Sequence, residues 1–108
     1  MKHAMAVVVA CAASVALAQQ PDYRVDIPLD VYLDALAHIA PAARDGAQSY
    51  LHAFRRRCGR ELTTRELRHA MADGDGDPVL MGMIRASSQQ DSGSLRTLES
   101  SISCSRRG

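Results

Sequence analysis

Three aspartates at alternate positions, Asp73, Asp75 and Asp77, form the most distinctive chemical group in the sequence. Hard cations such as Ca²⁺ bind several carboxylate oxygens close together, and calcium-binding loops begin with this spacing. The rest of that pattern is missing, because Pro78 stands where the loop needs a glycine and Ile84 where it needs a bidentate glutamate. We therefore predict no metal site in this segment.

Two interpretations of the segment remain. Glycines alternate with the aspartates, which is typical of a solvated connection between two helices, with Asp77 as the cap of the second one. Alternatively, the acidic segment is a contact surface for a basic partner protein. The candidate partner-binding site then consists of Asp73, Gly74, Asp75, Gly76 and Asp77.

The other polar residues show no pattern of a catalytic site. No two of His38, His52 and His69 are spaced three or four residues apart, so no helix carries a local histidine pair for a metal. His69 and Asp73 share one helix face and are the only mixed pair. No serine has the strand–turn–helix surroundings of a nucleophile elbow. We predict no catalytic residue, no cofactor and no enzymatic activity, with a small hydrolase as the enzymatic alternative.

Basic residues gather in Arg55, Arg56 and Arg57, followed by Arg60. A nucleic-acid-binding patch would have aromatic residues between the basic ones, and this cluster has none. We therefore interpret it as a solvated helix end partly paired with Asp or Glu. From residue 19 onward twelve Arg stand against nine Asp and three Glu. A formal net charge of zero gives no long-range attraction to polyanions, and we predict no nucleic-acid partner.

The first 18 of the 108 residues have the features of an export signal. Lys2 is followed by an apolar run from Ala4 to Leu17, which is too short for an ordinary membrane-spanning helix. The run ends in a small-x-small pattern that predicts cleavage after Ala18. Lipid anchoring at Cys11 is a minor alternative. The Ala- and Arg-rich composition is typical of a GC-rich bacterial genome, so the predicted compartment is the periplasm, with no membrane insertion after cleavage.

Cys58 and Cys104 remain after this cleavage. An even pair in an oxidising compartment predicts a structural disulfide, because neither cysteine has metal-ligating neighbours. Closing a loop of about 45 residues would contribute roughly 4 kcal/mol by loop-closure entropy. For a domain of about ninety residues this is a large part of the net stability.

Hydrophobic spacing predicts an all-α domain over residues 28–104, a small bundle of four to five short helices stapled by the disulfide. Residues 19–27 are expected to be an extended lead-in and 105–108 a flexible tail. The clearest helix ends at Gly59, a left-handed cap. Its apolar stripe consists of Ala43, Ala47, Tyr50, Leu51, Phe54 and Cys58.

The next helices have well-marked beginnings. Thr63 and Glu66 make a capping box, and Asp77 precedes a proline at the first position of the following helix. A polar link is expected over 87–94, before a last stripe. The apolar residues of these three helices are Leu67, Ala70 and Met71, then Leu80, Met83 and Ile84, and finally Leu95, Leu98 and Ile102.

The layout of the chain from residue 19 onward resembles that of the small helical immunity proteins that Gram-negative bacteria keep in the periplasm against type VI secretion cell-wall amidases. The similarity covers about Tyr50 to Cys104. An aromatic-bearing helix runs into a first cysteine, a Thr-initiated helix follows from Thr63 to Met71, and a proline-containing turn, a further helix and a late cysteine complete the order. The segment 87–94 is longer and more polar than in that layout.

The resemblance implies a non-enzymatic inhibitor, typically a dimer, that inserts a loop into the active-site groove of a peptidoglycan amidase. Segment 73–77 is the matching loop here. The alternative is a periplasmic adaptor or assembly factor for a secretion or envelope complex, which would use an exposed helix face. The cluster Leu80, Met81, Met83 and Ile84 would suit that role unless it belongs to the core.

Overall fold

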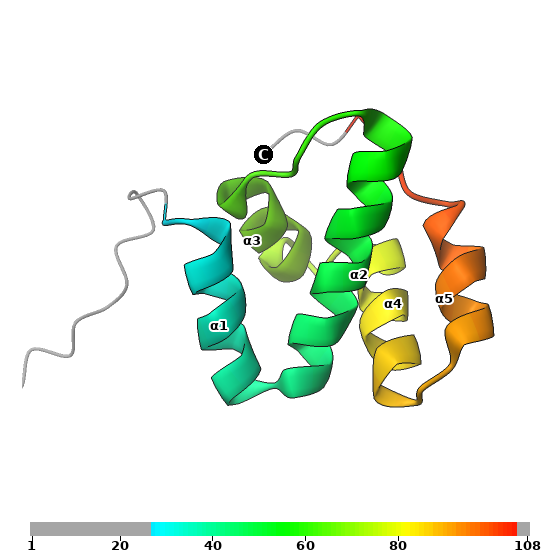
Figure 1. Ribbon diagram of the computed structural model, residues 1–108, viewed down its shortest axis with the longest axis horizontal. Helices are drawn as coiled ribbons and strands as arrows, with labels where there is room; N and C mark the ends of the chain where they lie inside the picture. The colour runs from blue at the N-terminus through cyan, green and yellow to red at the C-terminus, as the bar shows by residue number, and fades with distance from the viewer. Residues whose placement is uncertain (1–26, 106–108) are drawn as a thin grey trace, which may run out of the picture.

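The computed structural model describes residues 27–105, and over this range the chain forms five helices and no strand (Figure 1). The predicted all-α bundle is confirmed. The signal peptide with its cleavage site after Ala18, Cys11, residues 19–26 of the lead-in and residues 106–108 of the tail lie outside the described range. None of the described helices has the length and apolarity needed to cross a bilayer. The helices are α1 (Leu29–Ile39), α2 (Pro41–Cys58), α3 (Thr64–Ala72), α4 (Pro78–Ser88) and α5 (Ser92–Glu99).

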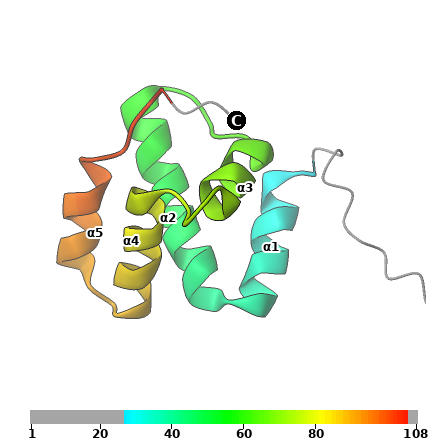
Figure 2. The ribbon, with the colours of Figure 1, turned by 180° about the vertical axis from the view of Figure 1, so that it is seen from behind.

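Helix α2 is the central element, with α1 and α5 on either side of it and α3 and α4 behind it (Figures 1 and 2). The rings of Tyr50 and Phe54 on its inner face stack at 6.4 Å and are fully buried. Helix α4 crosses α2 at Gly46, where the absent side chain lets Ile84 approach the α2 backbone. The largest buried side chains are those of Tyr50, Phe54, Leu62, Leu67, Leu80 and Met83.

The predicted helix ends are confirmed in detail. Gly59 has a φ of 70° and ends α2, and the Thr63 side chain and backbone exchange hydrogen bonds with Glu66 in a complete capping box. The side chain of Asp77 accepts a hydrogen bond from the backbone N–H of Leu80 at the start of α4. These local signals succeed because each satisfies backbone groups that a helix end leaves without a partner.

The predicted polar link over 87–94 is wrong, because α4 continues to Ser88 and α5 begins at Ser92. Gln90, with a φ of 54°, turns the chain within three residues. Asp91 then caps α5 by accepting hydrogen bonds from the backbone and hydroxyl of Ser94, at 3.0 and 2.6 Å. The cap makes an eight-residue helix out of a Ser- and Gly-rich segment.

The disulfide between Cys58 and Cys104 is confirmed, with a Cα–Cα distance of 5.4 Å. It joins the last residue of α2 to the segment that follows α5. Ile102 lies in this segment and is buried in the core, although α5 ends at Glu99. Of the expected stripe, Leu95 and Leu98 therefore lie in α5, whereas Ile102 lies in the non-helical segment that follows it.

Candidate functional site

The acidic segment 73–77 is a compact turn between α3 and α4 (Figure 2). The N–H of Asp77 donates to the carbonyl of Ala70 at 2.7 Å, and the N–H of Gly76 donates to the carbonyl of Asp73 at 2.9 Å. Gly76 has a φ of 83°, and a Cβ there would lie 3.0 Å from the side chain of Met81. The turn is therefore held against both helices, and only glycine fits this position without strain.

The three aspartates of the turn have different surroundings. Asp73 pairs with Nδ1 of His69 at 3.0 Å, which confirms that these residues share a helix face. Asp77 is half-buried and caps α4. Asp75 is exposed, and its carboxylate has no hydrogen bond or ion pair with any described residue. Of the three, Asp75 is the carboxylate that the fold leaves available to a partner.

The turn does not assemble a cation site. Its carboxylates do not converge, because Asp73 pairs with His69, Asp77 caps α4 and Asp75 is exposed to solvent. Among residues 27–105, no group of three or more His, Cys, Asp or Glu side chains is arranged to hold a metal ion.

The arginine-rich end of α2 is partly paired, as expected. Arg56 binds Glu99 on α5 at 3.2 Å, and Arg60 binds Glu66 on α3 at 2.8 Å. These contacts tie α2 to α5 and to α3, so they have a structural role. The sequence spacing predicts neither pair, because both depend on how separate helices pack.

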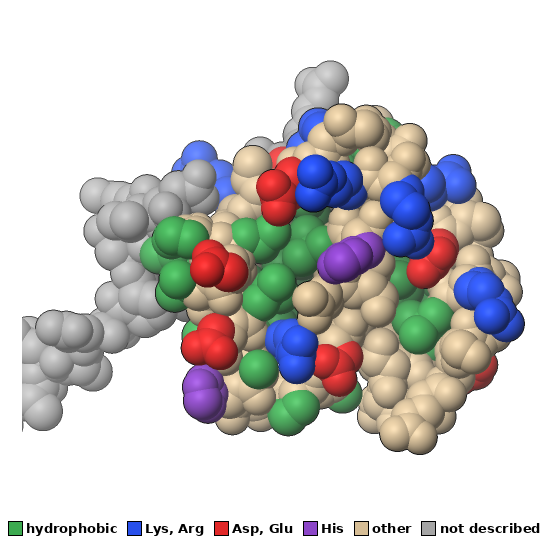
Figure 3. All heavy atoms as spheres, viewed as in Figure 1, with side chains coloured by type: hydrophobic (Ala, Val, Ile, Leu, Met, Phe, Trp, Pro, Cys, Tyr) green, Lys and Arg blue, Asp and Glu red, His purple; other side chains and the backbone are tan. Residues whose placement is uncertain are grey.

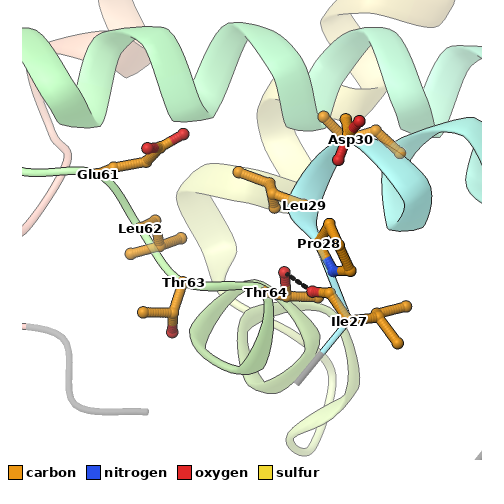
Figure 4. A pocket seen from close by; sticks show the side chains of 9 residues that line it. Ile27, Pro28, Leu29, Asp30, Glu61, Leu62, Thr63 and Thr64 are labelled. Atoms are coloured by element: carbon orange, nitrogen blue, oxygen red, sulfur yellow. Dashed lines mark hydrogen bonds between the residues drawn. The ribbon is translucent and has the colours of Figure 1, made fainter. Parts of the chain in front are cut away.

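A shallow hollow of about 630 Å³ lies where the start of α1 passes over the segment before α3 (Figure 4). The hydroxyl of Thr64 donates to the carbonyl of Ile27 at 2.7 Å, which anchors the first described residue to α3. Leu29 and Leu62 supply apolar lining, and Asp30 lies at the edge of the hollow. Thr64 is buried, and no pattern in the sequence indicates its role as an anchor.

The face shown in Figure 3 has apolar side chains between α1 and α2, bordered by charged ones. Leu29, Leu33 and Leu51 line a second hollow there, together with His52 and Arg55. The lining is mixed in character, with polar groups from α2 and from Glu61 in the segment before α3.

No protein-family model, curated protein sequence or solved structure matches the chain. The resemblance to periplasmic immunity proteins therefore stays a prediction.

Proposed function

We propose that the chain is a non-enzymatic periplasmic binding protein, an immunity protein that inhibits a peptidoglycan amidase effector through the turn 73–77. Export with cleavage after Ala18 is part of this proposal, and the Cys58–Cys104 disulfide supports it because such bonds persist in oxidising compartments. The homodimer that the resemblance implies also belongs to the proposal.

The observation that carries the proposal is the position of Asp75. Its exposed carboxylate lies in a turn whose flanking aspartates are occupied, by His69 on one side and by the α4 backbone on the other. A turn held in this way loses little conformational entropy on binding. An available carboxylate can then accept charge-assisted hydrogen bonds from amide or basic groups in a partner's groove.

The test uses the purified chain as bait for the secreted and envelope fractions of its own organism, followed by inhibition assays on any peptidoglycan amidase that is retained. We expect Asp75→Ala to weaken inhibition by about tenfold, which corresponds to about 1.4 kcal/mol. Asp34→Ala, at an exposed aspartate of α1, is the matched control and should inhibit like the wild type. Asp77→Ala is unsuitable, because loss of a cap costs about 1 kcal/mol of stability.

Either of two results would reject the immunity function. One is that the bait retains no amidase. The other is that Asp75→Ala inhibits as strongly as Asp34→Ala.

An adaptor or assembly factor is the second candidate, and the exposed apolar residues of α1 favour it. Val31 is 51% and Ile39 83% exposed. The sequence suggested another surface for this role, the cluster of Leu80, Met81, Met83 and Ile84, but these residues belong to the core. Leu80 and Met83 are fully buried, and Met81 and Ile84 pack against the core. A deletion strain with a transport or assembly defect and no sensitivity to an amidase would support this candidate over the first.

A further inference from the structure

An apolar groove of about 730 Å³ runs between α1 and α3, which lie side by side in both ribbon views (Figures 1 and 2). Its apolar lining comes from one stripe of each helix. The main contributors are Tyr32, Ala35, Leu36 and Ile39 on α1 and Met71 and Ala72 on α3.

Helix α1 is apolar on more than one side, and this stripe is only partly covered, because Tyr32 and Leu36 pack against the core whereas Ala35 and Ile39 are exposed. Leu29 and Leu33 lie toward α2, whereas the groove residues follow the i, i+3, i+4, i+7 spacing of a second face. No residue of α1 is fully buried, and Ile39 is 83% exposed. Packing within the bundle therefore does not account for Ile39 at the end of this stripe, and an apolar ligand would.

The α3 wall of the groove carries two arginines, Arg65 and Arg68, together with the carboxylate of Asp73. The Arg68 guanidinium lies 5.8 Å from the centre of the Tyr32 ring, and His69 is paired with Asp73. Arg65 is exposed, and none of the described residues forms an ion pair or hydrogen bond with its side chain. It lies in the first turn of α3, where a positive charge opposes the helix dipole. Helix stability therefore does not account for Arg65, and an acidic ligand would.

We propose that this groove binds an amphipathic helix of a partner protein, whose apolar face covers Leu36 and Ile39 and whose acidic flank meets Arg65. Helices bind apolar grooves through anchors at this spacing, and opposite charge along one wall sets their orientation. The proposal does not rest on the immunity function. Asp75 does not line the groove, so variants at the two places separate the two ideas.

Two fluorescently labelled synthetic helices of about 14 residues test the charge preference. Both carry leucines along one face, and the flank beside that face is glutamate in one peptide and lysine in the other. Anisotropy titrations with the full chain should show the glutamate peptide binding about tenfold more tightly, with the difference shrinking as salt is added. Arg65→Glu should abolish or reverse the preference, whereas Arg57→Glu, at an exposed arginine outside the groove, should preserve it.

A second pair of variants tests the location. Ile39→Gln should weaken binding of the glutamate peptide by about fivefold or more, because it removes an apolar anchor. Val31→Gln changes an exposed apolar residue of the same helix outside the groove and should bind like the wild type. Circular dichroism and thermal unfolding check that each variant is folded.

Several results would overturn the proposal. Equal affinity for both peptides would contradict the charge preference. Equal loss of peptide binding in Val31→Gln and Ile39→Gln would show that the peptide binds outside the groove. Self-association that Ile39→Gln abolishes would assign the groove to a second copy of the chain. Peptide binding only in a variant that lacks the residues before Ile27 would assign it to the chain's own N-terminal segment.

Discussion

The guanidinium of Arg60 binds the carboxylate of Glu66 through two parallel hydrogen bonds of 2.9 and 2.8 Å. The same carboxylate accepts the backbone N–H of Thr63 at 3.1 Å, and the Arg60 guanidinium lies 4.9 Å from the centre of the buried Phe54 ring. One ion pair thus joins the end of α2, the cap of α3 and the core. The hydrogen bonds from Arg60, assisted by those from Thr63, lower the pKa of Glu66 from 4.5 to about 2 against the opposing effect of burial.

This lowered pKa predicts a specific loss of stability in acid. Because the folded-state pKa is below the unfolded one, the contribution of Glu66 is fully present above pH 4.5 and is lost as the pH falls toward about 2. We expect a loss of about 2 kcal/mol, allowing for solvent screening of the exposed Arg60. Urea unfolding between pH 6 and pH 2 measures it. Glu66→Gln should lack this part of the pH dependence, and Glu61→Gln, at an exposed neighbouring glutamate, should retain it.

Gly46→Ala should destabilise the protein by about 3 kcal/mol, although alanine is the better helix former. A Cβ at this position would lie 2.5 Å from the Cα of Ile84 and 2.8 Å from its Cγ1, so α4 would have to move. Gly93→Ala is the control, because its Cβ would meet only Asp91, at 3.6 Å. Thermal unfolding of both variants measures whether Gly46→Ala lowers the stability of the protein. A Gly46→Ala protein as stable as the Gly93→Ala protein would contradict the close crossing of α2 and α4.

Removing the disulfide with the double variant Cys58→Ala/Cys104→Ala should cost about 4 kcal/mol, since it closes a loop with a sequence separation of 46. Ile102 should lose protection in hydrogen exchange before the inner face of α2 does, because the bond holds its segment in place. Denaturant unfolding of the oxidised wild type, the reduced wild type and the variant measures the effect. Reduced wild type and variant should agree, and a reduced protein as stable as the oxidised one would contradict the prediction.

Thr64→Val should loosen the start of α1 while leaving the bundle folded. The substitution removes the donor to the Ile27 carbonyl at a buried position, at a cost of about 1 kcal/mol. Hydrogen exchange should accelerate in the first turn of α1 more than in α2. Thr97→Val removes a hydrogen bond of an exposed threonine to the carbonyl of Gly93 and should change stability little. Equal effects of the two substitutions would show that Thr64 does not anchor α1.

The helix boundaries were predictable where the signal is local. Thr63 with Glu66, Asp77 with Pro78, and Gly59 each act within one helical turn, and each lies where the sequence places it. At Gly82 in α4, where a Cβ would lie 3.1 Å from a methyl group of Leu98, the absent side chain lets α5 approach closely. The start of α5 was not predicted because serine and glycine are poor helix formers, and this helix depends on a cap by Asp91.

The candidate site was predictable only as a stretch of sequence. Spacing alone makes Asp73, Asp75 and Asp77 equivalent, whereas the structure assigns two of them to His69 and α4. The groove between α1 and α3 escaped prediction because an apolar stripe looks the same whether another element covers it or not. Ile39 belongs to such a stripe, and only the packing of α1 against α2 shows that it is exposed.

The disulfide also turns everything from Cys58 to Cys104 into a covalent ring that contains α3, α4 and α5. A protease that cuts the exposed part of the turn at Gly74 or Asp75 opens this ring without releasing a fragment. The nicked protein would therefore migrate as one species on a gel until a reductant separates it into two. In an environment rich in proteases, such a cut leaves both halves of the molecule attached to each other.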